Sequence, residues 1–163
     1  MSIDSKLIRL TKHLYRNQES YVEMDDHSSG WRKQSTGIRQ GCPLSPYLFI
    51  IFMTVLMKDA RKEAGQGRWA EASSALGATE LLYADDTMLI GSTKSAINKL
   101  LHAIENQSSR YGMKLNKNKC EAIKMNTSAS IQFADSSHMN TVKHATYLGA
   151  SICPAGYKME IES

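Results

Sequence analysis

The sequence predicts an α+β fold in which helices pack on one face of an antiparallel sheet. Three segments are expected to be helices, at residues 4–17, 46–64 and 94–111, because their apolar residues form runs or spacings suited to a buried helix face. Between and after them lie short runs of β-branched, aromatic and aliphatic residues, which favour strands. Helices packed against an antiparallel sheet form a layered α+β arrangement.

The N-terminal region is expected to contain one helix and one hairpin. Leu7, Leu10 and Leu14 recur at helical spacing, which indicates an amphipathic helix. The hairpin is expected over residues 21–34. Its turn is expected at residues 27–30, where a histidine, two serines and a glycine follow one another.

A rigid loop is expected before the second helix. Residues 37–46 combine two glycines, two prolines and several polar side chains, and an almost unbroken apolar run follows at residues 47–57. Glycine lets the backbone approach a ligand closely, and proline fixes the geometry at the start of a helix. Arg39 and Gln40 could reach a base or a phosphate from this loop. Taken alone, however, the pattern is that of an ordinary loop and helix start.

Two adjacent carboxylates lie within the strand-like run at residues 81–90. Aspartate favours turns, so the run predicts a hairpin with Asp85 and Asp86 exposed at its tip. There the two charges repel each other unless a cation arrives. A hard divalent cation with oxygen ligands, Mg²⁺ above all, would suit them. The alternative is an ordinary hairpin that uses aspartates as turn residues.

The rest of the chain is expected to alternate short elements. Residues 65–77 are rich in small side chains and are expected to form a surface linker. Residues 91–93 should cap the helix at residues 94–111, in which Ile97, Leu100 and Ile104 share one face. Short strands are then expected near residues 113–115, 121–125, 130–133 and 142–152.

Composition narrows the class of protein only loosely. The chain has 163 residues, enough for one domain with a core, and a net charge of +4, which permits contact with nucleic acid without demanding it. Three cysteines without metal-ligand spacing are expected to be reduced thiols. The apolar run at residues 47–57 is too short to cross a bilayer, and the N-terminus lacks a signal-peptide pattern. We therefore expect an intracellular protein, cytoplasmic or nuclear, that is not secreted.

Four segments, in this order and spacing, resemble the palm domain of reverse transcriptases from non-LTR (LINE-like) retrotransposons. Residues 37–49 resemble motif B, Tyr83-Ala84-Asp85-Asp86 resembles the catalytic motif C, residues 112–120 resemble motif D, and residues 147–149 resemble motif E, the primer grip. Together these motifs extend over roughly residues 7–152.

The resemblance implies RNA-directed DNA synthesis by two-metal nucleotidyl transfer, with Mg²⁺ or Mn²⁺. It makes Asp85 and Asp86 metal ligands, with Asp85 the principal one, and it gives Lys119 the role of general acid. Nucleotide and template contacts then fall to Arg39, Gln40 and Gly41, and primer contacts to Tyr83, Ala84, Tyr147, Leu148 and Gly149. Without the resemblance, Lys119 would be one lysine of a solvated face, and Tyr147 a core residue.

One part of the family's pattern is not recognised in this sequence. In the family, motif A lies upstream of motif B, and its aspartate shares the metal ions with motif C. We therefore expect residues 1–152 to be a partial palm that starts after motif A, and residues 153–163 to be a C-terminal tail. The isolated chain is expected to be inactive, and to need the fingers, motif A and thumb of a retrotransposon polyprotein as well as RNA template, DNA primer and dNTPs. The alternatives are a non-catalytic relic and a co-opted nucleic-acid-binding palm.

Overall fold

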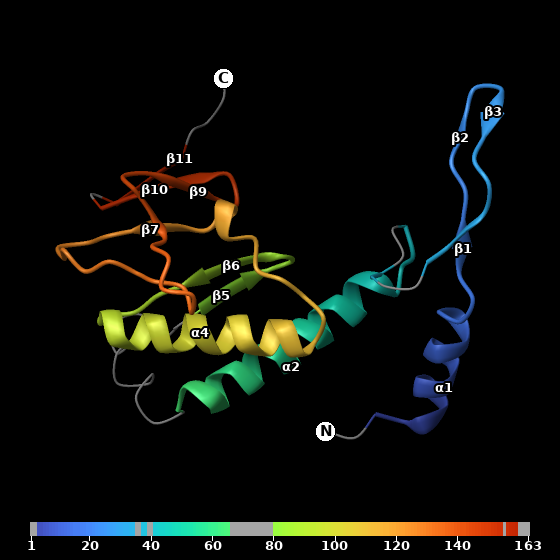
Figure 1. Cartoon of the computed structure of the whole chain (residues 1–163), viewed down its shortest axis with the longest axis horizontal. Coiled ribbons are helices and arrows are strands. Elements are labelled where there is room, and N and C mark those ends of the chain that lie inside the picture. The colour runs from blue at the N-terminus through green and yellow to red at the C-terminus, as the bar shows by residue number, and fades with distance from the viewer. Residues whose placement is uncertain (1–2, 35–36, 39–40, 66–79, 155, 160–163) are drawn as a thin grey trace. The chain divides into compact units, whose positions relative to one another are not determined.

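The computed structural model describes residues 3–34, 37–38, 41–65, 80–154 and 156–159. Its described helices are α1 (Ser5–Leu14), α2 (Ser45–Ala64) and α4 (Lys94–Arg110), and they are accompanied by short strands (Figure 1). This mixture confirms the predicted α+β class. The chain divides into two compact units, Met1–Ser45 and Pro46–Ser163. The linker expected at residues 65–77 lies, from residue 66 on, outside the described residues.

The first unit consists of α1 and a narrow β-ribbon. The Asp4 side chain caps α1 by accepting a hydrogen bond of 2.8 Å from the backbone N–H of Lys6. In the ribbon, β1 (Glu19–Ser20) pairs with β4 (Arg32–Lys33), and β2 (Glu23–Met24) pairs with β3 (His27–Ser28), both antiparallel.

The predicted hairpin is therefore confirmed, but its turn was placed wrongly. Met24 pairs with His27, so the turn consists of Asp25 and Asp26, and not of residues 27–30. Asp25 has a φ of 52°, a left-handed conformation that aspartate tolerates better than most residues.

Two helices form the core of the second unit. Leu56, Met57 and Ala60 of α2 are buried against Leu100, Ala103 and Ile104 of α4. Hydrogen bonds also join the two helices. The Glu63 carboxylate accepts from Asn106 Nδ2 at 2.7 Å and from Gln107 Nε2 at 2.6 Å. The Tyr111 hydroxyl donates to Asp59 at 2.8 Å. The two helices are thus held together by apolar packing with hydrogen bonds at one end.

Both ends of α4 follow from its sequence. The Thr93 hydroxyl accepts a hydrogen bond of 3.3 Å from the Ala96 N–H, which confirms the predicted cap. At the other end Gly112 has a φ of 75° and donates to Ser109 O, while the Met113 N–H donates to Ser108 O. This is the Schellman arrangement. It explains why residues 113–115 do not form the expected strand, since their first N–H group closes the helix.

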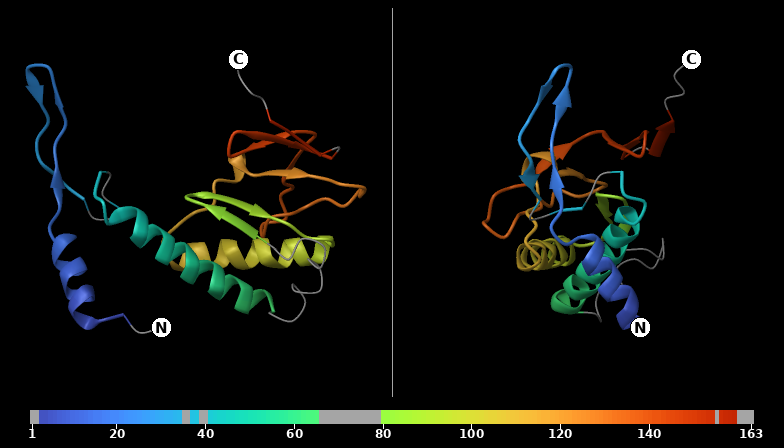
Figure 2. Two further views of the ribbon diagram at one scale, coloured as in Figure 1. Left: turned by 180° about the vertical axis from the view of Figure 1, so that it is seen from behind. Right: turned by 90° about the vertical axis from the view of Figure 1, so that its right-hand side faces the viewer.

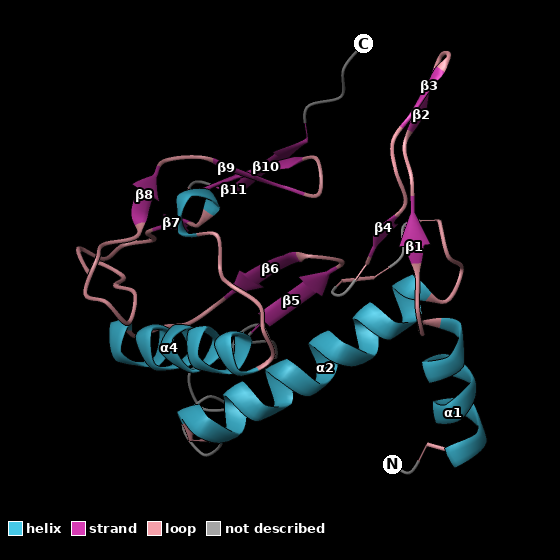
Figure 3. Cartoon of the chain, turned by 45° about the vertical axis from the view of Figure 1, so that its right-hand side comes forward, coloured by secondary structure: helices cyan, strands magenta, loops and turns pink. Residues whose placement is uncertain are grey.

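The described strands of the second unit form three small sheets. The hairpin of β5 (Glu80–Tyr83) and β6 (Asp86–Leu89) is antiparallel, whereas β7 (Glu121–Ile123) and β8 (Asn140–Val142) pair in parallel. A meander follows, in which β9 (Ala145–Tyr147), β10 (Ala150–Cys153) and β11 (Gly156–Met159) are antiparallel neighbours. The sheet is therefore divided, and one of its pairs is parallel. Figure 3 shows the separate pairs by secondary structure.

Within the second unit, α2 and α4 lie on one side of the β5–β6 hairpin, and the meander lies on the other side (Figures 1 and 2). The strand expected at residues 130–133 is reduced to a single bridge between Gln132 and His138. Part of the expected C-terminal tail forms β11, while the boundary at residue 152 stays a prediction. No helix in the described part of the chain is long and apolar enough to cross a membrane. None of Cys42, Cys120 and Cys153 forms a disulfide in the described part of the chain.

The core makes a testable prediction at Leu100, whose side chain is only 1% exposed. Leu100→Ala should lower the free energy of unfolding by about 2–5 kcal/mol, because it removes buried methyl groups and leaves a cavity between the helices. Leu7→Ala is the matched control, since Leu7 is also helical but 58% exposed, and it should change stability by less than about 1 kcal/mol. Urea unfolding followed by circular dichroism measures both. Equal losses would contradict the position of the core.

Candidate active site on the β5–β6 hairpin

The two adjacent aspartates lie at the tip of the β5–β6 hairpin. Tyr83 pairs with Asp86, so Ala84 and Asp85 form the two-residue turn and Asp86 begins β6. Both aspartates are exposed, and neither carboxylate has a hydrogen bond or ion pair with another described residue. The sequence predicted a turn of two aspartates. In the structure only Asp85 is in the turn, but both carboxylates remain open to a ligand.

The backbone at this tip is strained. Ala84 has a φ of 50°, in the left-handed region that residues other than glycine seldom adopt. Tight two-residue hairpin turns demand positive φ, and glycine or asparagine usually meets that demand. Because non-glycine residues in this conformation cluster at functional sites, the outlier agrees with a functional tip.

The carboxylates fit a divalent cation by their chemistry. Mg²⁺ prefers oxygen ligands and is often held by one or two carboxylates together with substrate phosphates and water. Asp85 and Asp86 offer such oxygens on adjacent residues, and none of these oxygens is bonded to another described side chain. Over the described ranges, no group of three or more His, Cys, Asp or Glu side chains gathers in a way that could hold a metal ion.

The segment that resembles motif E contacts strand β5 of this hairpin through a hydrogen bond. Tyr147, on β9, is half-buried, and its hydroxyl donates a hydrogen bond of 3.3 Å to the backbone carbonyl of Leu81 on β5. Leu148 and Gly149, with φ of 52° and 78°, form the two-residue turn between β9 and β10. Both values are positive, as a type I′ turn requires. The structure thus brings Tyr147 together with the strand that leads to Asp85.

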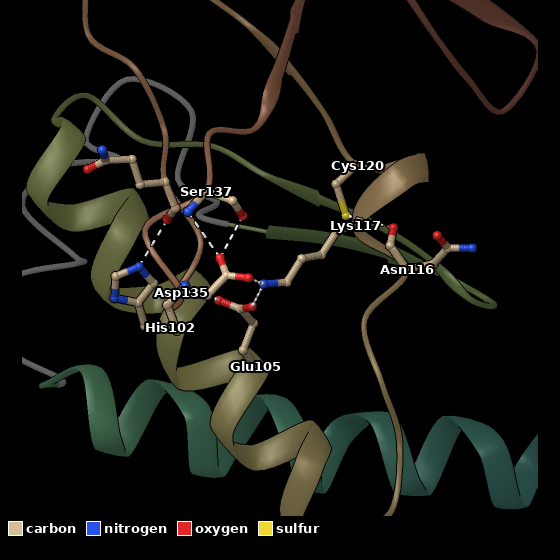
Figure 4. Close-up of polar contacts among 9 residues, drawn as sticks. His102, Glu105, Asn116, Lys117, Cys120, Asp135 and Ser137 are labelled. Atoms are coloured by element: carbon tan, nitrogen blue, oxygen red, sulfur yellow. Dashed lines mark hydrogen bonds and ion pairs between the residues drawn. The ribbon is translucent and has the colours of Figure 1, made fainter.

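Two of the three lysines in the segment that resembles motif D have different surroundings although they are close in the chain. Both belong to the single 3₁₀ turn η1 (Lys117–Lys119). Lys119 is exposed and has no hydrogen bond or ion pair from its side chain to a described residue. The Lys117 ammonium lies 2.7 Å from Asp135 and 3.2 Å from Glu105 (Figure 4). Sequence reasoning grouped the lysines together and missed Lys117, because its acidic partners lie 12 and 18 residues away in the sequence.

These contacts shift the pKa values of Lys117 and Asp135. The hydrogen bond from Lys117, together with those from Ser137, holds the pKa of the Asp135 carboxyl well below its usual value. The hydrogen bond to Asp135, with a further one to Glu105, raises the pKa of the Lys117 ammonium. Lys117 and Asp135 are therefore both charged at neutral pH.

The predicted motif B residues are only partly placed. Arg39 and Gln40 lie outside the described residues. Gly41 is exposed and has a φ of 78°, a conformation that favours glycine. Beside it, the backbone N–H of Leu44 lowers the pKa of the Cys42 thiol. Gly41 belongs to the first unit, whereas the hairpin with Asp85 belongs to the second.

A concavity of about 730 Å³ lies elsewhere, along α2, α4 and Ala134. Among its lining residues, Glu63, His102 and Glu105 already bind other parts of the chain. Since the aspartates of the hairpin are not part of it, we place the candidate site at the exposed tip and not in this concavity.

The family is decided by comparison with known sequences. A profile of the reverse transcriptase (RNA-dependent DNA polymerase) family matches residues 1–152. The chain belongs to the reverse transcriptase family. The match extends over nearly the whole chain and includes the strained hairpin, η1 and β9 described above. It confirms the resemblance on which the site residues were predicted, although the role of each residue stays a prediction.

Three relatives add detail to this reverse transcriptase segment. It is 29% identical over 110 residues to the Retrovirus-related Pol polyprotein from type-1 retrotransposable element R2 of Nasonia vitripennis, covering 68% of this chain and 10% of that protein. It is 32% identical over 98 residues to the corresponding polyprotein from type-2 element R2DM of Drosophila melanogaster, covering 58% and 9%. An uncharacterised mitochondrial protein of Arabidopsis thaliana is 45% identical over 56 residues, covering 32% and 46%. The chain therefore spans about a tenth of the length of the two Pol polyproteins.

The strained turn predicts that Ala84→Gly stabilises the protein. Glycine adopts a positive φ without the clash of a Cβ atom, so the free energy of unfolding should rise by about 0.5–1 kcal/mol. The matched control is Ala122→Gly on β7, where φ is not positive and glycine should be destabilising by a similar amount. Urea unfolding of the three proteins is the measurement. A loss of stability in Ala84→Gly as large as in the control would contradict the strain.

The ion-pair cluster predicts a dependence of stability on acid pH. Because the pKa of Asp135 is lowered in the folded state, its contribution is complete above its ordinary value of 3.8 and is lost as the pH falls below it. The difference in stability between the wild type and Asp135→Asn should therefore be greatest near neutral pH and should shrink between about pH 4 and pH 2. Denaturant unfolding at a series of pH values measures it. In the control Asp26→Asn, on an exposed turn, a difference that shrinks in the same way would contradict the assignment.

Proposed function

We propose that this chain is the catalytic core segment of a retrotransposon reverse transcriptase and makes DNA on an RNA template as part of a longer polypeptide. One observation carries the proposal: in a chain of this family, two adjacent carboxylates are exposed on a strained hairpin and are not engaged by other described residues. The retrotransposon origin is supported by the names of the two R2 polyproteins, and the longer polypeptide by their length.

Asp85 and Asp86 would hold the divalent cations, Mg²⁺ or Mn²⁺. Bound there, such ions would lower the pKa of the primer 3′-hydroxyl and neutralise charge on the triphosphate. Asp85 is the principal ligand in this proposal because it occupies the turn itself, where its side chain is exposed. Asp86 is fixed by its pairing with Tyr83 and would be the second ligand.

Lys119 would act on the leaving group. As the primer 3′-oxygen forms its bond to the α-phosphate, the bond from that phosphate to the β-phosphate oxygen breaks. The Lys119 ammonium would give its proton to the pyrophosphate that leaves. Its exposed position without a described partner suits this role better than that of Lys117, whose ammonium is bound by two carboxylates.

The primer and the template would be held by the neighbouring turns. Tyr83 and Ala84 directly precede Asp85 and Asp86 in the chain and would lie along the primer terminus. Leu148 and Gly149 would contact the primer backbone from an exposed turn. Tyr147 belongs to the same motif, but its hydroxyl already donates to Leu81 and would support the hairpin.

Contacts to the incoming nucleotide and the template are proposed for Arg39, Gln40 and Gly41. Gly41 has no side chain and adopts a positive φ, so a nucleotide could approach its backbone closely. The partners of the whole protein in this proposal are RNA template, DNA primer, dNTPs and the remaining segments of the polyprotein.

The test is primer extension on poly(A)/oligo(dT) by a longer polypeptide that contains this chain with its flanking segments. Asp85→Asn removes a charge that holds metal in the transition state, so kcat should fall by about 10²–10³-fold or more. Template affinity should hardly change, because it rests mainly on phosphate contacts from lysine and arginine. Asp26→Asn is the matched control, an aspartate at the turn of another hairpin, and should leave extension unchanged.

Two outcomes would contradict parts of this proposal. If Asp86→Asn abolishes extension and Asp85→Asn does not, the roles of the two carboxylates are reversed. If neither substitution matters in an active polypeptide, the hairpin is a structural turn and the proposed function of this chain is wrong.

A further inference from the structure

The Lys117 side chain joins three separate segments of the second unit. Its ammonium contacts Glu105 of α4 at 3.2 Å and Asp135 of the 133–137 turn at 2.7 Å. It also lies 4.7 Å from the centre of the Phe133 ring, which is almost completely buried. A lysine with two carboxylates and an aromatic face around it is held in one position, unlike a lysine on a solvated surface.

The two carboxylates are themselves fixed by other groups (Figure 4). Glu105 accepts a hydrogen bond of 2.7 Å from the backbone N–H of Ala134. Asp135 accepts from the backbone N–H of Ser137 at 3.1 Å and from its hydroxyl at 2.6 Å. Lys117 therefore binds a preformed acidic site on α4 and the adjoining turn, and a preformed site holds its partner with less loss of entropy.

The element that carries Lys117 has little stability of its own. The turn η1 has three residues, and the hydrogen bonds that close it are Lys119 N–H to Asn116 O at 3.0 Å and Cys120 N–H to Lys117 O at 3.2 Å. So short a turn does not persist without contacts from elsewhere. The Lys117 side chain supplies such contacts and thereby fixes the position of η1 on α4.

Lys119 follows two positions later on the same turn. With three residues per turn, side chains at positions 117 and 119 point about 120° apart around the axis of η1. When Lys117 is bound to the acidic site, Lys119 is therefore directed to another side of η1, and its side chain is exposed.

We infer that Lys117 is a positioning residue for Lys119: its ion pairs fix η1 so that the Lys119 ammonium is presented to the leaving pyrophosphate. This inference rests on the proposed role of Lys119 in catalysis. The ion pairs of Lys117 themselves do not depend on that role, so the two can be tested apart.

The first test uses the 163-residue chain and needs no activity. In Lys117→Met, which keeps the length of the side chain and removes its charge, the amides of Lys119 and Cys120 should exchange their hydrogens about fivefold faster or more. Exchange in the middle of α4 should stay unchanged. Lys117→Arg, which keeps the charge, should restore most of the protection.

Lys114→Met is the matched control, because Lys114 belongs to the same segment and is exposed without a described partner. If Lys117→Met does not fold, Asp135→Asn removes the shorter ion pair and leaves the lysine in place, and it should loosen the same two amides. Unchanged exchange in the folded variants, or an equal effect in Lys114→Met, would overturn the inference.

The second test is a double-mutant cycle in the longer polypeptide, measured by primer extension. Lys119→Ala should lower kcat about 10²-fold, and Lys117→Met about 10-fold, with little change in template affinity. In the Lys119→Ala background, Lys117→Met should have no further effect, because its effect passes through Lys119. A role in folding alone would give additive losses and would overturn the inference. If Lys119→Ala has no effect while Lys117→Met loosens η1, the proposed acid is wrong but the ion pairs of Lys117 stand.

Discussion

The packing of α2 against α4 is the contact on which the rest of the second unit depends. Each helix contributes three buried apolar residues, and Leu89 of β6 packs against the same cluster. The β5–β6 hairpin is therefore joined to the helices at its base, while its tip with Asp85 stays exposed. Hydrophobic burial fixes one end of the hairpin and leaves the other end exposed, as the proposed site requires.

Helix α4 uses its opposite side in a different way. Asn98, His102 and Glu105 are spaced four and three residues apart, so they lie on one stripe of the helix. All three side chains form hydrogen bonds with the backbone of residues 132–134. Asn98 Oδ1 accepts from the Gln132 N–H at 3.2 Å, and His102 Nε2 donates to Gln132 O at 2.9 Å. Glu105 accepts from the Ala134 N–H at 2.7 Å. These side chains thus provide residues 132–134 with hydrogen bonds that a neighbouring strand would otherwise supply, since the segment forms only a single β-bridge. It also fixes the acidic site that receives Lys117.

The sequence predicted what depends on local chemistry and failed where distant partners decide. Helix α4 was predicted closely because Thr93 caps it and its apolar spacing is regular. The β5–β6 hairpin followed from two strand-like runs around Asp85 and Asp86. The turn at Asp25 and Asp26 was missed, because the neighbouring His27-Ser28-Ser29-Gly30 is an equally good turn sequence. The difference between Lys117 and Lys119 was beyond sequence reasoning, since it depends on carboxylates brought in from α4 and a later turn.

The exposed tip and its fixed surroundings have complementary roles in the proposed reaction. A metal ion with its nucleotide can reach Asp85 and Asp86 only if no side chain of the protein occupies them, which leaves two like charges close together and a strained Ala84. Such a tip is stable only if the two strands that carry it are held in place.

Leu89 holds β6 by packing against the helix core, and the Tyr147 hydroxyl holds β5 by its hydrogen bond to the Leu81 carbonyl. Because Tyr147 is followed directly by the turn of Leu148 and Gly149, a primer bound at that turn would press on the residue that supports the hairpin. In the proposed function, primer binding and the position of Asp85 and Asp86 would therefore be mechanically linked through β9.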